Sequence, residues 1–482
     1  MNVRSVLHIL SFLLLIAGGA MGVCFGISAY CGDPPRAQLA LNISSCVALL
    51  AGLLLKITNR GELELSRKDG FAIVSFGWLL LGLFGAVPYV LSGVIPDPVG
   101  AVFETVSGFT TTGASVMSDV ESAPKGILFW RALTQWLGGV GVLVLCLAIL
   151  PFIGSSGMKI FQAEVAGPTK DRLTPKIAAT AKLLWGIYAL LTVLEILFLK
   201  FGGMGWFDST CHSFATLATG GFSTRNISIE AYRSPFIEWV VIAFMFLGGV
   251  NFALFYRAIR GNPFAFFRDT EFRWYLGILA GSTLIIAISI FHGPMASIGG
   301  SVRAACFQSV SIMTTTGFSS ADFDRWPPVA CFVLMTLVFV GGCAGSTAGA
   351  IKVQRLVVAV KAAVRHARLF LHPQAIIQVK LDREVLDSEE AGGIVTFIAT
   401  YLLVFVLASV LMTPFMPDLR SAVSAAAAAL GNVGPGLGAI GPYCNYSAVP
   451  AEGKLLLAFC MLVGRLELFT VFVLFLPSYW KK

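Results

Sequence analysis

Residues 103–116, FETVSGFTTTGASV, place three consecutive threonines and Gly113 in a chain that is otherwise strongly apolar. Residues 307–320, FQSVSIMTTTGFSS, repeat this phrase, and seven of the eleven positions that end at Gly113 and Gly317 are identical. Two related phrases are CHSFATLATGG, which ends at Gly221, and SAAAAALGNVG, which ends at Gly434. A glycine-ended phrase that recurs at spacings of 108, 96 and 117 residues indicates four copies of one unit.

The composition is that of a polytopic membrane protein. Of the 482 residues, 56% are hydrophobic and 12% are charged, whereas soluble proteins carry about 25% charged residues. A bilayer-spanning helix needs about 20 apolar residues. The sequence predicts ten such spans, at 7–30, 37–57, 71–95, 126–153, 177–201, 234–259, 272–293, 328–363 (interrupted), 391–413 and 453–478.

The basic residues orient the chain. With the N-terminus inside, the predicted cytoplasmic loops and both termini hold 22 of the 34 Lys and Arg residues. Such a bias is the positive-inside rule, so the net charge of +8 indicates membrane topology and not nucleic-acid binding. We therefore expect cytoplasmic N- and C-termini and a basic cytoplasmic face that contacts membrane lipid.

Each predicted unit has the same order: an apolar span, about ten small and apolar residues, the glycine phrase, and a second span. Residues that start helices, such as Asp208 and Asp418, precede or open the short segment. Irregular polar backbone at membrane depth is tolerated only inside protein or beside water. The sequence therefore predicts an all-α fold of four pseudo-symmetric repeats, each a helix, a re-entrant pore helix and a second helix, around one pore. The expected boundaries are a hairpin at 1–65 and repeats at 66–165, 166–265, 266–388 and 389–482.

Four glycine phrases around one axis can form an ion filter. Rings of backbone carbonyls replace the water shell of a monovalent cation, and glycine permits the φ/ψ that turns carbonyls inward. The C-terminal ends of the short helices also favour a cation. The alternative is that these glycines only let helices pack closely. In the second phrase both Gly220 and Gly221 are candidates, and Gly221 is favoured because it aligns Thr219 with Thr111 and Thr315.

The second spans also align, as WLGGVG (136–141), FLGGVN (246–251), FVGGCA (339–344) and LVGRLE (462–467). The fourth has Arg465 where the others have a second glycine. An arginine at membrane depth is costly, so we expect it to face the pore below the filter, with Glu467 as a possible counter-charge. A buried structural ion pair is the alternative.

Residues 341–350, GGCAGSTAGA, carry only small side chains in the third repeat. Successive glycines weaken a helix, so we expect an unwound loop across the pore and a helix that resumes near Lys352. A tightly packed, kinked helix is the alternative.

These segments resemble the superfamily of Trk, Ktr and HKT potassium transporters, and the two extra spans at the start fit its bacterial TrkH/TrkG branch. The phrases TTTGAS, TGGFST, TTTGFSSADF and GNVGPGLGAIGP are similar to its four filter segments. GGCAGSTAGAIKV (341–353) and VGRLELFTV (463–471) are similar to its intramembrane loop and its last-helix arginine motif.

The resemblance implies potassium uptake across the bacterial inner membrane, a homodimer with one pore per subunit, and a cytosolic TrkA-type ring that binds nucleotides. Glycine in all four filters implies potassium preference, and a serine in the first accompanies sodium permeation in the superfamily. Potassium is the only expected bound ion, without an organic cofactor. The expected filter residues are Thr110, Thr111, Thr112, Gly113, Thr219, Gly220, Gly221, Thr314, Thr315, Thr316, Gly317, Asn432, Val433 and Gly434. The expected gate residues are Gly342, Gly345, Ser346, Thr347, Gly349, Lys352 and Arg465.

Three other functions compete with potassium uptake as explanations of the sequence. A sodium- or proton-coupled cation symporter of the same architecture shares every feature above. A membrane enzyme lacks support, because the sequence has no clustered nucleophile, acid–base pair or metal-ligand set. A non-conducting scaffold does not need four glycine phrases. Asn432 and Val433 depart from the threonine pattern, so the fourth quarter is expected to coordinate an ion less well.

Overall fold

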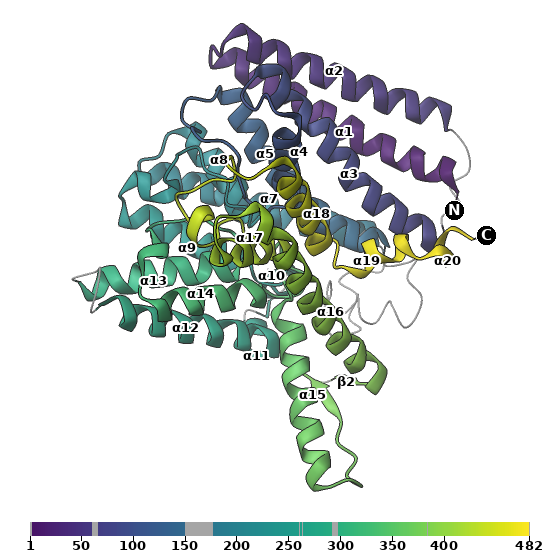
Figure 1. The fold of residues 1–482 in the computed structure, drawn as a ribbon, viewed down its shortest axis with the longest axis vertical. Helices are drawn as coiled ribbons and strands as arrows, with labels where there is room; N and C mark the ends of the chain where they lie inside the picture. Colours follow the sequence, from purple (N-terminus) through teal and green to yellow (C-terminus); the bar gives the residue numbers. More distant parts are fainter. Residues whose placement is uncertain are drawn as a thin grey trace.

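The computed structural model describes residues 2–59, 66–149, 177–259, 261–262, 264–291, 297–382 and 384–481. These residues form mainly helices (Figure 1), the structure that satisfies backbone polar groups within a bilayer. Six helices are long and apolar enough to span it, and two bent helix pairs raise that number to as many as eight within the described part. The six are α1 (Val3–Tyr30), α2 (Pro35–Thr58), α3 (Arg67–Ser92), α7 (Ile177–Phe201), α12 (Thr270–Phe291) and α16 (Ser388–Met412).

Two predicted spans, 234–259 and 453–478, are broken, so the expectation of continuous helices there is wrong. The first consists of α9 (Pro235–Gly248) and α10 (Phe252–Ile259), which are bent by 95°. The second consists of α18 (Ala451–Arg465) and a segment of α19 (Phe469–Phe472) and η5 (Val473–Phe475), bent by 109°. Apolar composition alone does not distinguish a broken helix from a straight one.

Four short helices lie between the long ones, as the repeat predicts. They are α4 (Pro98–Phe109), α8 (Trp206–Leu217), α13 (Ile298–Met313) and α17 (Leu419–Gly431). Asp418 caps α17 by accepting a hydrogen bond from the Ser421 N–H at 2.8 Å. Asp208 does not cap α8, contrary to expectation, because it lies inside the helix and binds Thr224 and Arg225 instead.

Three further helices form the second halves of the first and third predicted units: α5 (Lys125–Ile149), α14 (Pro328–Val340) and α15 (Val353–Leu371). Two short helices, α11 (Ala265–Arg268) and α20 (Pro477–Trp480), lie outside this pattern. The end of the predicted span 126–153 and the loop 155–176 lie outside the described residues. The interruption expected within 328–363 is present, because α14 ends at Val340 and α15 begins at Val353.

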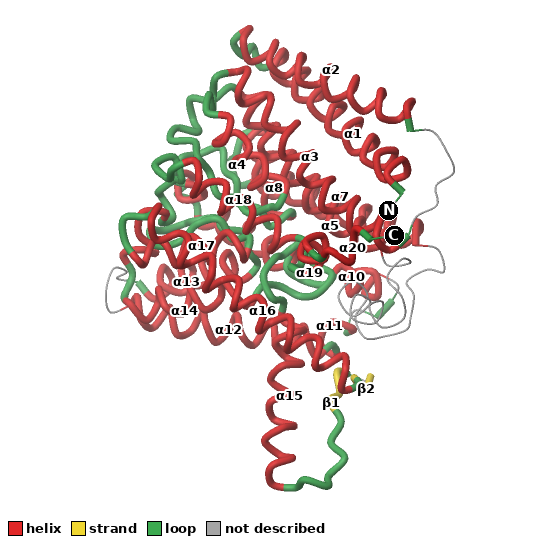
Figure 2. Tube along the Cα trace, turned by 45° about the vertical axis from the view of Figure 1, so that its right-hand side comes forward, coloured by secondary structure: helices red, strands yellow, loops and turns green. Residues whose placement is uncertain are grey.

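An arm extends away from the helical body (Figures 1 and 2). It consists of α15 and the returning chain, which holds an antiparallel hairpin of β1 (Val379–Leu381) and β2 (Glu384–Leu386). This two-stranded hairpin departs from the all-α expectation. We call residues 353–386 the arm.

The two termini lie at the same end of the molecule, beside the start of α3 (Figure 1). The Asn2 N–H donates to Asp69 Oδ1 at 2.7 Å. The Tyr479 hydroxyl donates to the Lys68 carbonyl at 2.6 Å, and Lys68 Nζ donates to the Lys481 carbonyl at 2.7 Å. Both ends are thus held on one side of the bundle, as an even number of crossings requires.

Asp33, in the turn between α1 and α2, attaches the N-terminal hairpin to the first unit. Its carboxylate accepts hydrogen bonds from the Lys125 and Gly126 N–H groups at 3.0 and 2.7 Å, at the start of α5. The Ser28 hydroxyl donates to the same carboxylate at 2.7 Å. A side chain of one hairpin therefore caps the helix of another unit.

We predict that Asp33→Ala destabilises the chain by about 0.5–2 kcal/mol, the usual cost of losing a helix N-cap. The measurement is the apparent thermal unfolding midpoint in detergent, with Asp33→Asn as a variant that retains an acceptor oxygen. The exposed Glu452, on the first turn of α18, provides the control substitution Glu452→Ala. Equal midpoints for Asp33→Ala and Glu452→Ala would contradict the capping role.

Candidate functional site

All four short helices end in the same backbone motif. After α4, the Thr111 and Thr112 N–H groups donate to the carbonyls of Gly108 and Ser107 at 3.0 and 2.8 Å. With Thr111 in the left-handed region (φ 53°), these bonds form a Schellman C-terminal motif. The same pair of bonds and a left-handed residue recur at Thr219, Thr315 and Asn432, with φ of 53°, 59° and 55°.

A glycine follows each left-handed residue by two positions. The φ angles of Gly113, Gly221, Gly317 and Gly434 are 82°, 75°, 79° and 93°. These angles favour glycine, because other residues rarely adopt them. A left-handed threonine costs about 1–3 kcal/mol, and such strain clusters at functional sites. The matching angles show that the four segments, although different in sequence, share one backbone conformation.

The four glycine segments contact one another in a closed ring. A Cβ atom on Gly113 would overlap the carbonyl oxygen of Gly220, in the second segment. In the same way a Cβ on Gly221 would overlap the Thr316 carbonyl oxygen, and a Cβ on Gly317 would overlap that of Val433. A Cβ on Gly434 would lie 2.5 Å from the Thr112 carbonyl oxygen. Each segment therefore packs its glycine against the backbone of the next, and the fourth returns to the first.

The ring distinguishes the two candidate glycines of the second segment. Gly221 has the positive φ and abuts the third segment, as Gly113, Gly317 and Gly434 do in theirs. Gly220 is equivalent to Thr112 of the first segment. The Gly220 carbonyl faces Gly113, just as the Thr112 carbonyl faces Gly434. This geometry favours the alignment on Gly221.

Asn432, which departs from the threonine pattern of the other segments, keeps their backbone motif. Asparagine adopts the left-handed conformation more readily than threonine, and Asn432 does so at the end of α17. Its amide Nδ2 donates to Thr112 Oγ1 at 3.1 Å and to the Met461 carbonyl at 2.9 Å. The fourth segment thus keeps the shared backbone and also bonds directly to the first.

Threonine side chains behind the ring are buried, and four of them pair through their hydroxyls. The Thr110 and Thr112 hydroxyls lie 2.8 Å apart, and Thr314 and Thr316 repeat this contact at 2.8 Å. Gly113, Gly221 and Gly317, by contrast, are partly exposed. The glycines thus border accessible space while the threonine side chains face the protein.

Gln135 and an ion pair support the first two segments, and sequence reasoning missed them. Gln135 Nε2 donates to the Gly220 carbonyl at 2.5 Å, and its Oε1 accepts from the Phe222 N–H at 3.1 Å. Arg131 Nε lies 2.6 Å from Glu104 Oε1, and both side chains are buried. The ion pair could have been suspected from the sequence, because Glu104 and Arg131 each lie in an apolar helix. A charged residue in such a helix usually has a partner.

The predicted unwound loop is present and packs against the other units. It covers residues 341–352, between α14 and α15. The Cys343 N–H donates to the Gly249 carbonyl at 2.8 Å, and the Gly345 carbonyl accepts from the Phe252 N–H at 3.1 Å. Both partners lie at the break between α9 and α10. The loop and this break therefore satisfy each other's backbone groups.

The middle of the loop lies against the ends of the short helices. Thr347 Oγ1 donates to the Leu217 carbonyl at 2.9 Å, at the end of α8. The Gly349 N–H donates to Thr315 Oγ1 at 2.8 Å, in the third glycine segment. The Ser346 hydroxyl donates to the Cys343 carbonyl at 2.6 Å and closes a turn within the loop. A Cβ on Gly342 would lie 2.7 Å from the Ala348 side chain, so the loop is tightly packed.

Arg465 contacts the loop, as the alignment of the second spans predicts. Its Nη1 donates to the Thr347 carbonyl at 2.8 Å, and the side chain is buried. Glu467, the suggested counter-charge of Arg465, pairs with Lys352 at 3.3 Å and with Arg355 at 2.7 Å. Glu467 and Leu468 have φ of 58° and 47°, so the break after α18 is strained where Glu467 reaches the loop.

Comparisons with known proteins agree with this geometry. A family model described as cation transport protein, TrkH, matches residues 36–482. The chain is 40% identical to the Trk system potassium uptake protein TrkH of Halomonas elongata and 38% identical to that of Escherichia coli K12, each over 100% of both chains. The crystal structure of the potassium transporter TrkH from Vibrio parahaemolyticus matches with a TM-score of 0.92 and 34% identity over 100% of both chains.

A match over most of the chain in family, sequence and structure identifies the family. Together with the apolar helices, it makes this a multi-pass membrane protein. The chain belongs to the TrkH family of cation transport proteins, and it is a transport protein and not an enzyme.

Proposed function

We propose that this chain takes up potassium through a filter formed by its four glycine segments. The observation that carries the proposal is their closed ring, in which one backbone conformation recurs four times. Four equivalent segments can direct four carbonyls at an ion on their common axis, and so replace its water shell. The relatives named as potassium uptake proteins support potassium as the ion.

The four-repeat pore follows from the same ring. Each segment is preceded by a short helix whose C-terminal end, with its partial negative charge, points to the ring and favours a cation. The proposed units are residues 66–165, 166–265, 266–388 and 389–482, after the hairpin 1–65. Each chain then encloses one pore.

We propose that loop 341–352 and Arg465 close the pore on its cytoplasmic side. The loop contacts the end of α8 and the third glycine segment, and Arg465 holds it from the fourth unit. Arginine keeps its charge at all physiological pH values and offers five donors in a rigid fork. The barrier is therefore steric and electrostatic, and opening requires the loop or Arg465 to move.

We propose that a cytosolic nucleotide-binding partner of the TrkA type controls this gate. The chain would act as a homodimer in the bacterial inner membrane. The arm extends from the body directly after the loop, where a partner could pull on it (Figure 2). The positive-inside bias of the sequence supports a cytoplasmic location for the arm and both termini.

The first prediction concerns selectivity. Gly113→Ser should lower the preference for potassium over sodium at least about tenfold, or ~1.4 kcal/mol, because its Cβ would displace the Gly220 carbonyl. Competition of sodium with rubidium uptake in proteoliposomes measures this preference. Thr111→Ala, which keeps the backbone carbonyl, is the control. Unchanged selectivity in well-folded Gly113→Ser would refute the filter assignment, and dependence of uptake on a sodium or proton gradient would favour the coupled symporter.

The second prediction concerns the gate. Deleting part of 343–349, or making Arg465→Ala, should raise rubidium flux without a partner, because each removes contacts that hold the loop. Selectivity should change little, since the glycine ring remains. Flux that falls or stays constant in both variants, with normal folding, would show that the loop is only a packing element.

The third prediction concerns regulation. Purified chain without a partner should not bind ATP or NADH in isothermal titration calorimetry. The predicted cytoplasmic loops are short, and none has the strand–turn–helix context of a nucleotide-binding domain. Binding at micromolar or tighter affinity would place nucleotide sensing in this chain.

A further inference from the structure

Glu271, on the first turn of α12, binds both ends of the intramembrane loop. It is 6% exposed, and its Oε1 accepts hydrogen bonds from the Ala344 N–H at 2.6 Å and from the Gln354 N–H at 3.0 Å. Ala344 lies near the start of the loop, and Gln354 lies on the first turn of α15. One carboxylate oxygen from a different helix thus connects the two points where the chain enters and leaves the loop.

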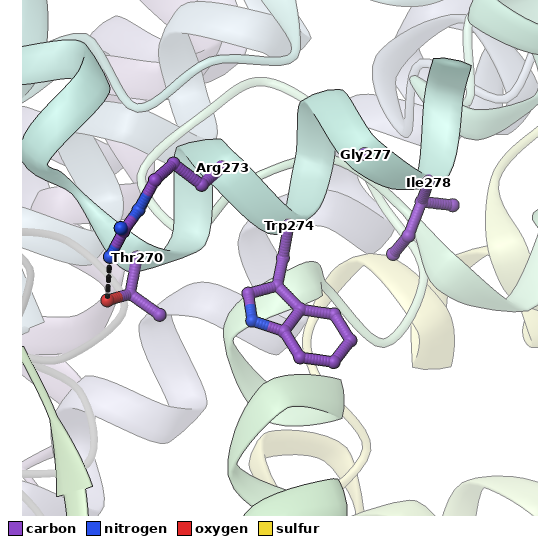
Figure 3. A pocket seen from close by; sticks show the side chains of 5 residues that line it. All are labelled: Thr270, Arg273, Trp274, Gly277 and Ile278. Atoms are coloured by element: carbon purple, nitrogen blue, oxygen red, sulfur yellow. Dashed lines mark hydrogen bonds between the residues drawn. The ribbon is translucent and has the colours of Figure 1, made fainter. Parts of the chain in front are cut away.

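The neighbouring residue connects the same turn to the arm. The Thr270 N–H and hydroxyl donate to Asp382 Oδ1 at 3.0 and 2.5 Å. Asp382 lies in the turn between β1 and β2 of the arm. Arg273 Nη2 donates to the Thr270 hydroxyl at 3.2 Å, and its side chain lies along the outer surface of α12 toward Thr270 (Figure 3).

We propose that Glu271 is a positioning residue that holds loop 341–352 in its closed conformation, and that the Thr270–Asp382 contact makes this hold sensitive to the arm. A displaced arm would pull on the first turn of α12 through Asp382 and on Gln354 through α15. Both movements lengthen the hydrogen bonds to Glu271. The effect on potassium flux rests on the proposed gate, whereas the effect on loop position does not.

Two explanations of Glu271 make opposite predictions. If the hydrogen bonds to Oε1 position the loop, then the side chain must reach both N–H groups, and charge is secondary. If Glu271 acts only as a counter-charge for the nearby Lys352, then charge matters and reach does not. Glu271→Gln keeps the reach and an acceptor oxygen but removes the charge. Glu271→Asp keeps the charge but is one methylene shorter.

Cys343 offers a direct measure of loop position, independent of transport. It lies within the loop, next to Ala344, and is fully buried. Reaction of a buried thiol with N-ethylmaleimide tracks the population in which its surroundings have opened. Labelling in proteoliposomes is read at Cys343 by peptide mass spectrometry. Cys211, on α8 and also buried, is the internal control for general unfolding.

Glu271→Asp should raise the Cys343 labelling rate at least about tenfold over the natural chain, and Glu271→Gln should stay within about twofold, because only the reach to both N–H groups matters. Cys211 labelling should not change. Asp382→Ala should raise Cys343 labelling by a smaller factor. Unchanged labelling in Glu271→Asp, or the reverse order of the Asp and Gln variants, would overturn the role of Glu271. If Cys343 in Asp382→Ala is labelled at the same rate as in the natural chain, the link to the arm would be overturned.

Rubidium flux in the same vesicles separates this proposal from the proposed gate. Faster Cys343 labelling together with raised flux in Glu271→Asp supports both. Faster labelling without raised flux supports the positioning role and contradicts the loop as a gate.

Discussion

The arrangement of the four units rests on one repeated contact, in which a glycine of each segment packs against a backbone carbonyl of the next. A Cβ at Gly113, Gly221, Gly317 or Gly434 would clash with that carbonyl, so a side chain there requires the next segment to shift. The contact requires a left-handed residue two positions earlier, and the Schellman motif that ends each short helix supplies it. Helix length, helix end and glycine position are therefore linked in all four units.

The loop after α14 is irregular backbone that lies against the end of α8 and the third glycine segment. Unwinding it exposes backbone groups at membrane depth, which must find partners. The break between α9 and α10 supplies two of them, Glu271 supplies another, and Arg465 binds the Thr347 carbonyl. Irregular backbone in one unit is thus stabilised by irregular backbone and charged residues of its neighbours.

The sequence was sufficient for the features that depend on local pattern. The repeated phrase predicts the short helices and the glycine positions, and the small residues at 341–350 predict the loop. The alignment of Arg465 with the second glycines of the other spans predicts that it faces the pore below the filter, and Arg465 binds the Thr347 carbonyl of the loop. Asn432 has the same left-handed backbone as the aligned threonines, and the weaker ion coordination expected of the fourth quarter stays a prediction.

Features that depend on distant partners could not be predicted. The spans 234–259 and 453–478 are apolar apart from a few charged residues, and their breaks lie where the loop contacts them. Glu271 is separated from Ala344 by 73 residues, and Gln135 from Gly220 by 85, so no local pattern connects them. The sequence indicates Glu467 as a counter-charge. Its pairs with Lys352 and Arg355 depend on the folded path of the loop, which no local pattern predicts.

The most direct test of the filter is anomalous diffraction from crystals of the chain grown with thallium(I), a heavy substitute for potassium. If the ring is the filter, anomalous peaks will lie on the axis enclosed by Gly113, Gly221, Gly317 and Gly434, surrounded by carbonyl oxygens of all four segments. A ring without thallium, in crystals that bind the ion elsewhere in the chain, would contradict the filter assignment.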